Sequence, residues 1–394
     1  MNPIVVHKYG GSSLATTEKV QAVARRIADT VDEGYRVVAV VSAMGGSTDE
    51  LLARAKELSE NPNRRELDML LSVGERVSTA LLAIALDELG LAAVSFTGSQ
   101  AGIITNARHN RARIVEVRAF RVLDELDAGK VVIVAGYQGV SYSREITTLG
   151  RGGTDTTAVA LAAALDAEHC DICSDVDGVY SADPRVVKNA DRIDELSTNE
   201  MLTMARRGAR VLHRECVEYA GRHGIGLFAK STFGPKDDTG TVVRMNPARE
   251  APLVTAVVHE QEVGEISLTE DADLDDCLQM MADAGAFPTA VFGPPFRIVV
   301  SLDDAHHWDS LVLLLGSKLG DHCSCGKNQG TVTVVGHGLG EEPGLVTKIR
   351  RAVEEVVGQP VPMQLNPIEL SFIVPSITVR QLVGKLHETL LEAV

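Results

Sequence analysis

The 394-residue chain is short of cysteine, of positive charge and of long apolar runs, and each shortage excludes a class of protein. Six cysteines in a chain of this length do not make the framework of a disulfide-stabilised domain. The 38 Lys and Arg against 54 Asp and Glu give a formal net charge of −16, which argues against nucleic acid or an anionic membrane as a partner. No run reaches the about 18 apolar residues of a membrane-spanning helix. The first residues lack a basic segment followed by an apolar core, so we expect a cytoplasmic protein.

Two groups of cysteines have spacings that metal sites use. Cys170 and Cys173 form a C-x-x-C pair, but their surroundings are typical of a buried strand and no second pair completes a site. His322, Cys323 and Cys325 lie close together in the sequence, where a metal would still need a fourth ligand from elsewhere. We therefore predict no metal site built by the protein alone.

The first 245 residues alternate between apolar β-branched runs and helical patterns. This alternation predicts an α/β fold with a mainly parallel central sheet between helix layers, and the 45% apolar content is enough for a large core. The expected strands are 4–6, 37–41, 93–96, 131–135, 171–174 and 226–228, and the expected helices are 17–31, 65–89, 111–128, 154–165 and 199–207. Ligands of such folds bind at the carboxyl ends of the strands, so the turns that follow them should meet in one crevice.

The pattern changes at residues 245–254, where Asn246-Pro247 and Ala251-Pro252 indicate a linker. Two similar units follow, each reading strand, helix, two strands and helix. The first has expected strands 265–268, 290–292 and 297–302 with helices 274–284 and 308–319; the second has strands 331–335, 363–365 and 369–374 with helices 344–357 and 379–391. A tandem repeat of this kind leaves one sheet face open for self-association or for a small effector.

Two glycine-rich turns open directly into helices. One is Thr147-Thr148-Leu149-Gly150-Arg151-Gly152-Gly153-Thr154-Asp155, and the other is Lys8-Tyr9-Gly10-Gly11-Ser12-Ser13. The first turn of a helix presents unpaired N–H groups and the positive end of the helix dipole, where an anion binds. Neither turn has the spacing of a Walker loop or of a dinucleotide fingerprint. Glycine pairs also serve backbone geometry alone, and this alternative stays open at this point.

These parts suit the transfer of a phosphoryl group from a nucleotide to an anionic acceptor, because such a reaction needs positioning and cationic stabilisation. A carboxylate acceptor is already a nucleophile near neutral pH, so it requires no general base. Asp155 would then orient Lys8 or a metal-bound water; alternatively it is only a first-turn carboxylate favoured by the helix dipole. Glu75 would bind an ammonium group and Arg151 a carboxylate, unless Glu75 simply lies on the polar face of its helix.

Taken in order, these motifs resemble the aspartokinase family of the amino acid kinase superfamily. The matching segments are Lys8-Tyr9-Gly10-Gly11-Ser12-Ser13, Ser42-Ala43-Met44-Gly45, Ser72-Val73-Gly74-Glu75-Arg76, residues 149–158 and residues 174–185. The resemblance implies the amino acid kinase fold for residues 1–245. It also implies two α+β ACT-like domains, a divergent one at 255–328 and a second at 329–394, through which at least a homodimer would form.

The resemblance further implies that the chain transfers the γ-phosphoryl group of ATP to the β-carboxylate of L-aspartate, with Mg²⁺ bridging the phosphates. The product, 4-phospho-L-aspartate, is the first intermediate toward lysine, threonine and methionine. The implied catalytic residues are Lys8 and Asp155. The implied substrate-binding residues are Thr48, Glu75, Arg151, Gly152, Gly153 and Thr154. The implied nucleotide-binding residues are Lys8, Tyr9, Gly10, Gly11, Ser42, Ser174, Asp175, Tyr180, Ser181, Ala182, Asp183, Pro184, Arg185 and Arg210.

The sequence departs from the family pattern at several positions. Arg210 stands where lysine is usual, and its planar guanidinium reaches phosphate differently. Thr154 replaces a serine and keeps the hydroxyl. The second repeat retains Glu342-Pro343-Gly344 at a helix start, whereas the first has five carboxylates within residues 270–276. These charges would disfavour the carboxylate of an amino-acid effector, so we expect weakened or altered feedback by lysine or threonine. The alternative is a solvated first turn, with effectors bound at the repeat interface.

Three functions fit the sequence to different degrees. The leading interpretation is an active aspartokinase, either of general amino-acid synthesis or of a dedicated secondary pathway. A related amino acid kinase could use another acceptor such as glutamate. A non-catalytic regulatory subunit would use only the ACT-like repeats, but it would not need Lys8, Arg151 and Asp155 together.

Overall fold

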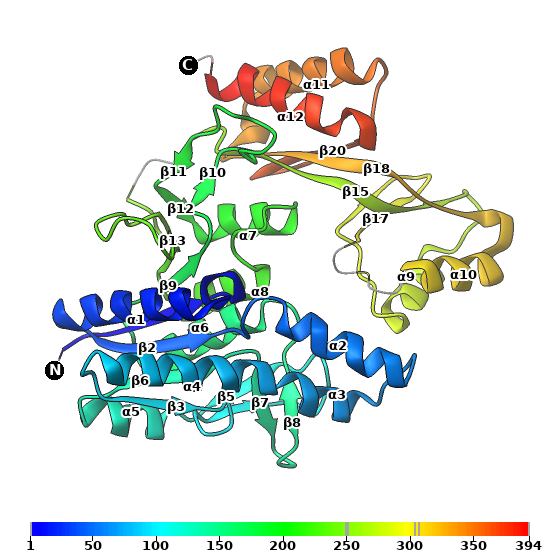
Figure 1. Ribbon diagram of the computed structural model, residues 1–394. Helices are drawn as coiled ribbons and strands as arrows, with labels where there is room; N and C mark the ends of the chain where they lie inside the picture. Colours follow the sequence, from blue (N-terminus) through cyan, green and yellow to red (C-terminus); the bar gives the residue numbers. More distant parts are fainter. Residues whose placement is uncertain (1, 249–251, 303–304, 306–307, 393–394) are drawn as a thin grey trace. The chain divides into compact units, whose positions relative to one another are not determined.

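The computed structural model describes residues 2–248, 252–302, 305 and 308–392, and the chain divides into two compact units (Figure 1). The first unit contains residues up to 179, 193–201 and 211–248; the second contains residues 180–192, 202–210 and the described residues from 252 onward. Strands β10 (Val179–Tyr180) and β11 (Arg192–Ile193) span two of the points at which the chain passes between units. The predicted linker includes residues 249–251, which lie outside the described residues.

The first unit is built on an eight-stranded sheet whose strand order is β12-β14-β13-β9-β1-β2-β6-β3. Every neighbouring pair whose register is given is parallel except β13 with β14, which is antiparallel. The strands are β1 (Ile4–Tyr9), β2 (Arg36–Val41), β3 (Ala93–Phe96), β6 (Val131–Ala135), β9 (His169–Ser174), β12 (Glu195–Ser197), β13 (Leu227–Ser231) and β14 (Thr241–Arg244). The predicted α/β fold with a mainly parallel sheet is confirmed.

Helices cover both faces of this sheet. The helices of the first unit are α1 (Thr17–Asp32), α2 (Ser47–Leu58), α3 (Arg64–Leu71), α4 (Val73–Glu88), α5 (Phe120–Asp127), α6 (Gly153–Ala164) and α8 (Arg214–His223), and α7 (Thr198–Arg206) is divided between the units. Val5 and Tyr9 of β1 pack with α1 and α4 in one core. Side chains alternate along a strand, so Lys8 points to the opposite face, where α6 contacts β1.

Four strand ends lie in register at one edge of the sheet. Tyr9 at the end of β1 pairs with Val41 and Cys173, and Val41 pairs with Ala135. The turns that follow β1, β2, β6 and β9 therefore start side by side. This edge is the predicted location for ligands in a parallel α/β sheet.

Two of the helices predicted in the first unit differ from the structure. The predicted helix 65–89 is two helices, α3 and α4, separated at Ser72. Residues 64–88 form the stretch of the described chain that is long and apolar enough to span a membrane, but Leu82 and Leu86 within it pack in the core of the unit. The predicted helix 111–128 is wrong in its first half, because Ile114, Val115 and Val117 are β-branched residues that favour a strand, and they form β5 (Ile114–Val117) before α5.

A four-stranded sheet of order β5-β4-β7-β8 was not predicted. Its other strands are β4 (Ile103–Thr105), β7 (Gln138–Ser141) and β8 (Ile146–Thr148). Strands of three or four residues carry little periodic signal, although β3, which also has four residues, was predicted. This sheet matters because β8 leads directly into the glycine turn before α6.

The second unit contains a six-stranded sheet of order β16-β17-β15-β18-β20-β19, with all neighbouring pairs antiparallel. The strands are β15 (Ala256–Leu268), β16 (Ala290–Phe292), β17 (Arg297–Ser301), β18 (Cys323–Val335), β19 (Met363–Asn366) and β20 (Glu369–Pro375). The helices are α9 (Leu274–Asp283), α10 (Trp308–Leu319), α11 (Pro343–Val357) and α12 (Val379–His387). The two predicted units are therefore joined in one sheet, because β15 and β18 each extend through both halves.

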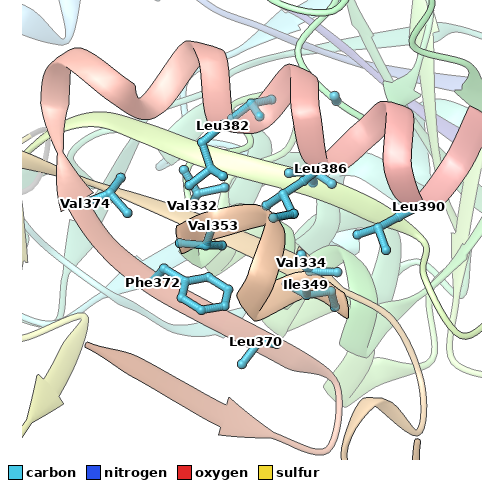
Figure 2. Packing of buried hydrophobic residues seen from close by; sticks show 14 of the residues in the cluster. Val332, Val334, Ile349, Val353, Leu370, Phe372, Val374, Leu382, Leu386 and Leu390 are labelled. Atoms are coloured by element: carbon cyan, nitrogen blue, oxygen red, sulfur yellow. The ribbon is translucent and has the colours of Figure 1, made fainter. Parts of the chain in front are cut away.

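Each half of this sheet has its own hydrophobic core. One core contains side chains of α9, α10 and the neighbouring strands. The other contains α11, α12, β18 and β20, where Leu382 and Leu386 lie over Val332 and Phe372 (Figure 2). Ala182 also belongs to this second core, so part of the 180–192 segment packs inside the second unit.

Candidate functional site

A cavity of about 380 Å³ lies at the carboxyl edge of the parallel sheet. All of its lining residues belong to the first unit. They are Lys8, Gly11, Ser42, Ala43, Gly45, Thr48, Glu75, Tyr137, Gly150, Arg151, Gly152, Gly153, Thr154, Asp155 and His213. The cavity thus brings together Lys8 and Arg151, the two cations of the predicted phosphate and carboxylate sites.

Lys8 and Asp155 form an ion pair in the cavity wall. Lys8 Nζ lies 2.6 Å from Asp155 Oδ1, and the two side chains are 12% and 9% exposed. Burial alone would lower the pKa of Lys8, but the charge of Asp155 and its hydrogen bond raise that pKa above its ordinary value overall. The Lys8 ammonium is therefore charged throughout the physiological pH range.

The glycine turn fixes the start of α6 beside this ion pair. Gly152 is the N-cap residue, with a φ of +68° that favours glycine, and no side chain caps the helix. A Cβ at Gly152 would also lie 2.3 Å from His213 Cγ, so no other residue fits there. On the other side, a Cβ at Gly11 would lie 2.8 Å from Ala43 O. Bare backbone and a helix N-terminus therefore line the same cavity, as an anion site requires.

Glu75 is a buried carboxylate whose hydrogen bonds are incomplete. Its Oε1 accepts from Ala43 N over 3.3 Å, whereas Oε2 is buried with no hydrogen-bond partner among the described residues. Burial raises the pKa of Glu75 to about 7, although hydrogen bonds from its own backbone and from Ala43 oppose the shift. A buried carboxylate oxygen without a donor, on a residue that lines a cavity, is suited to accept a hydrogen bond from a bound cation.

A hydrogen bond between two hydroxyl groups links the turn after β2 to the first turn of α6. Ser42 Oγ donates to Thr154 Oγ1 over 3.0 Å. Gly136 permits this arrangement, since a Cβ there would lie 2.5 Å from Thr154 Cγ2. The threonine in place of the family's serine keeps this hydrogen bond.

Sequence reasoning missed Tyr137 and His213 as cavity residues. Tyr137 follows β6 at the carboxyl edge of the sheet and has a φ of +65°, which is uncommon outside glycine. Its position after a strand was the signal that could have identified it. His213 lies three residues after Arg210 and packs against Gly152, a contact that only the fold creates.

Several predicted nucleotide residues do not line the cavity. In the first unit, Tyr9 is buried on the other face of β1 beside His7, and Gly10, Ser174 and Asp175 are also absent from the lining. The remaining residues, Tyr180, Ser181, Ala182, Asp183, Pro184, Arg185 and Arg210, belong to the second unit.

The second-unit residues divide between buried and exposed positions. Ser181 Oγ lies 2.9 Å from His387 Nε2, and Ala182 is buried in the core with α11 and α12. Arg185 is exposed, and its guanidinium donates to Asp183. The exposed arginine is thus available to a ligand, whereas the side chains of Ser181 and Ala182 are used within the unit.

The described part of the chain contains no group of three or more His, Cys, Asp or Glu side chains that could hold a metal. Cys170 and Cys173 are buried in β9, and the sulfur atoms of Cys323 and Cys325 lie 3.8 Å apart on β18. A cation at the cavity would therefore need most of its ligands from a bound substrate and water.

Comparison with known proteins identifies the relatives of this chain. Residues 3–229 match the amino acid kinase family. The chain is 39% identical over 415 residues to an aspartokinase of Mycolicibacterium smegmatis, a match that covers 98% of this chain and 95% of that protein. Its fold matches E. coli aspartokinase III in complex with aspartate and ADP, with a TM-score of 0.83 and 26% identity, over 98% of this chain and 99% of that one. The same enzyme with lysine and aspartate matches over the same shares, with a TM-score of 0.74 and 27% identity. With near full-length similarity and the cavity just described, the chain belongs to the aspartokinase family.

Proposed function

We propose that this phosphotransferase moves the γ-phosphoryl group of ATP to the β-carboxylate of L-aspartate, with the cavity of the first unit as the acceptor site. The observation that carries the proposal is that Lys8, Arg151, Glu75 and the uncapped start of α6 line one cavity. E. coli aspartokinase III, which shares the fold, has been solved with aspartate and ADP. The reaction places the protein in amino-acid biosynthesis, in the cytoplasm.

The acceptor is held at both of its charged ends. Glu75 Oε2 accepts from the substrate ammonium, which supplies the hydrogen bond that this buried oxygen lacks. The Arg151 guanidinium donates to a carboxylate, and Thr48 also lines the cavity. This arrangement distinguishes an amino acid from a simple dicarboxylate.

The transfer itself requires charge stabilisation more than proton transfer. An oxygen of the acceptor carboxylate attacks the γ-phosphorus while the bond to the β,γ-bridging oxygen breaks, and ADP leaves with those electrons. Lys8 and the amides of the glycine turns stabilise the equatorial oxygens. Asp155 keeps the Lys8 ammonium in place at 2.6 Å. Since the nucleophile is already ionised, no general base is needed.

Mg²⁺ fits this site as a companion of the nucleotide. It prefers oxygen ligands and usually keeps several waters, being bound through one or two carboxylates and substrate phosphates. Asp155 is the cavity carboxylate beside the proposed phosphate site and would accept a hydrogen bond from such a water, which agrees with the lack of a three-ligand cluster among the described side chains. When bound, Mg²⁺ supplies neutralisation of phosphate charge.

We expect the domains to have the same roles as in the family. Residues 1–245 supply catalysis, residues 255–328 and 329–394 form two ACT-like domains, and these domains join at least two copies of the chain. The expected nucleotide contacts are Ser174, Asp175, Tyr180 and Arg185, and the expected phosphate contact is Arg210.

Feedback by lysine or threonine is weakened or altered. Asp273 caps its own helix in the first repeat, because Asp273 Oδ1 accepts from Asp275 N over 2.8 Å and from Asp276 N over 3.3 Å. The N–H groups that would bind the carboxylate of an effector are thus already used, among five acidic residues. Titrating lysine and threonine against purified enzyme tests this: we expect no inhibition in the micromolar range, and micromolar inhibition by either would refute it.

Trapping the acyl phosphate with hydroxylamine tests the main function. Three reactions are compared, with ATP and Mg²⁺ plus L-aspartate, L-glutamate or no acceptor. We expect hydroxamate with L-aspartate only. Hydroxamate with L-glutamate would indicate a different acceptor, and no hydroxamate in any reaction would contradict the proposed activity.

A further inference from the structure

Asp68 is a fully buried carboxylate outside the cavity lining. It lies on α3 and its exposed fraction is 0%. A carboxylate buried to this degree is costly unless its oxygens accept hydrogen bonds. The segments that supply the donors therefore reveal what this residue holds together.

Two segments supply those donors. Thr148 Oγ1 donates to Asp68 Oδ1 over 2.5 Å, and Asn110 N donates to the same oxygen over 3.0 Å. His109 Nδ1 lies 2.6 Å from Asp68 Oδ2. Asn110 has a φ of +66°, a left-handed conformation that the hydrogen bond to Asp68 helps to hold. Both oxygens of the Asp68 carboxylate thus already have hydrogen-bond partners within the protein, so we do not assign this carboxylate to a ligand.

Thr148 connects Asp68 to the turn that carries Arg151. It is the last residue of β8 and lies two residues before Gly150, which lines the cavity. The next residue, Leu149, donates its N–H to Tyr137 O over 2.9 Å. The base of the turn is therefore fixed at two successive residues, and the first of them is fixed by Asp68.

In the other direction, Asp68 is part of the helix that leads to Glu75. α3 ends at Leu71, and Ser72 alone separates it from α4, which carries Glu75 in its first turn. Gln138 Nε2 donates to Ser72 O over 2.8 Å, so this junction is also fastened to β7. A shift of α3 would therefore move Glu75.

We propose that Asp68 is a positioning residue for the acceptor: through Thr148 and through α3, it fixes the separation of Arg151 and Glu75. This role rests on the proposed function, in which these two groups bind the ends of the amino acid. Displacements of about 1 Å are enough to impair such a site strongly. Neither group is assigned to the nucleotide, so the effect is confined to the acceptor.

Two isosteric variants test the role from both sides of one hydrogen bond. Asp68→Asn weakens the acceptor and Thr148→Val removes the donor, while both keep the side-chain shape. We expect KM for L-aspartate to rise by about tenfold or more in each, with KM for ATP changed by less than about twofold. Thr148→Ser keeps the hydroxyl, so it should restore KM for L-aspartate to within about threefold of wild type.

A matched control comes from the second unit. Thr333 Oγ1 and Ser371 Oγ form a buried hydrogen bond of 2.8 Å, and Thr333→Val removes it. This variant should lose thermal stability with both KM values unchanged.

Two results would overturn the positioning role. One is an unchanged KM for L-aspartate in a folded variant of Asp68 or Thr148, and the other is an equal rise in both KM values, which would indicate general loosening. If Asp68→Asn fails to fold, Thr148→Val decides the question. A wild-type enzyme inactive with every acceptor would instead refute the proposed function, so the two failures are distinguishable.

Discussion

Each unit contains a buried ion pair, and the two pairs are used differently. Lys8 and Asp155 in the first unit share one contact of 2.6 Å beside a cavity. Arg207 and Glu369 in the second unit form two parallel hydrogen bonds of 2.9 and 2.7 Å, and Arg207 Nη1 also donates to Thr289 O over 3.1 Å. The second pair is nearly saturated with protein partners, whereas the Lys8 ammonium keeps donors for a substrate.

The comparison separates a structural ion pair from the proposed catalytic pair, although both pairs are buried. Exposure does not distinguish them, since the side chains are 12% and 9% exposed in the first pair and 7% and 10% in the second. The unused hydrogen-bonding capacity does. The same criterion separates Asp68, which has donors on both oxygens, from Glu75, whose Oε2 has none among the described residues.

The largest expected effect is on the stability of the second unit. Arg207→Ala leaves Glu369 buried without its cation, so the free energy of unfolding should fall by about 3–5 kcal/mol. Chemical denaturation followed by circular dichroism measures the change. The double variant Arg207→Met/Glu369→Leu is the control and should recover much of the loss; equal losses in the single and double variants would contradict this account.

The Arg207–Glu369 pair also predicts a pH dependence. Burial alone would raise the pKa of Glu369, but the hydrogen bond and charge of Arg207 lower it overall. Because the folded pKa is depressed, the unfolded state binds more protons at low pH. The contribution is complete above about pH 4.5 and is lost as the pH falls further. The free energy of unfolding of Arg207→Ala should therefore not show this loss as the pH falls.

Lys8→Ala tests the proposed catalytic pair. Loss of a preorganised cation should lower kcat by about 10²–10³-fold, because the charge on the transferring group is then less stabilised. The free energy of unfolding should fall by less than in Arg207→Ala, since Asp155 lines the cavity. Lys8→Arg keeps the charge and is the matched comparison; kcat near the wild-type value in Lys8→Ala would remove the residue from the mechanism.

Glu75 predicts how acceptor binding depends on pH. Its raised pKa of about 7 means that the side chain is protonated below that pH and cannot balance the substrate ammonium. KM for L-aspartate should therefore rise about tenfold per pH unit below 7 and stay level above it. Steady-state kinetics between pH 5.5 and 8.5 measure this. Glu75→Gln should have a high KM without that pH dependence, and an unchanged dependence would assign it to another group.

The smallest expected effect is at Thr154. Thr154→Ser keeps the hydroxyl that lies 3.0 Å from Ser42 Oγ, so kcat should stay within about twofold of wild type. Thr154→Val removes that hydrogen bond and should lower kcat more than Thr154→Ser does. Equal activity in both variants would show that the link between the two loops is dispensable.

The sequence predicted long helices from their periodic patterns and several strands from apolar runs. Strands β3 and β6 have the expected bounds, whereas the helix predicted over 65–89 is divided at Ser72. Strand β4 has three residues and was invisible for that reason. The amino half of β15 was missed because the polar residues 259–262 separate the apolar residues 256–258 from the predicted strand. In the structure residues 256–260 pair with β18, and the register shifts between Glu260 and Val263.

For the cavity, motifs in the sequence predicted several lining residues, but the sequence did not predict contacts between residues far apart in the chain. Lys8, Glu75 and Arg151 were predicted from motifs, and the structure brings all three into one cavity. His213 lines it only because Gly152 lacks a side chain, a contact between distant residues that no local pattern encodes. Asp68 gave no signal either, since a buried acid and a surface acid look alike in one sequence.

Strands β15 and β18 are thirteen residues long and continue through both halves of the six-stranded sheet. Separation of the halves would require breaking both strands at their centres. The two halves of the sheet should therefore unfold together in one cooperative transition, and backbone amides in both halves should be equally protected from hydrogen exchange. A conformational change in one repeat would then also displace the other repeat.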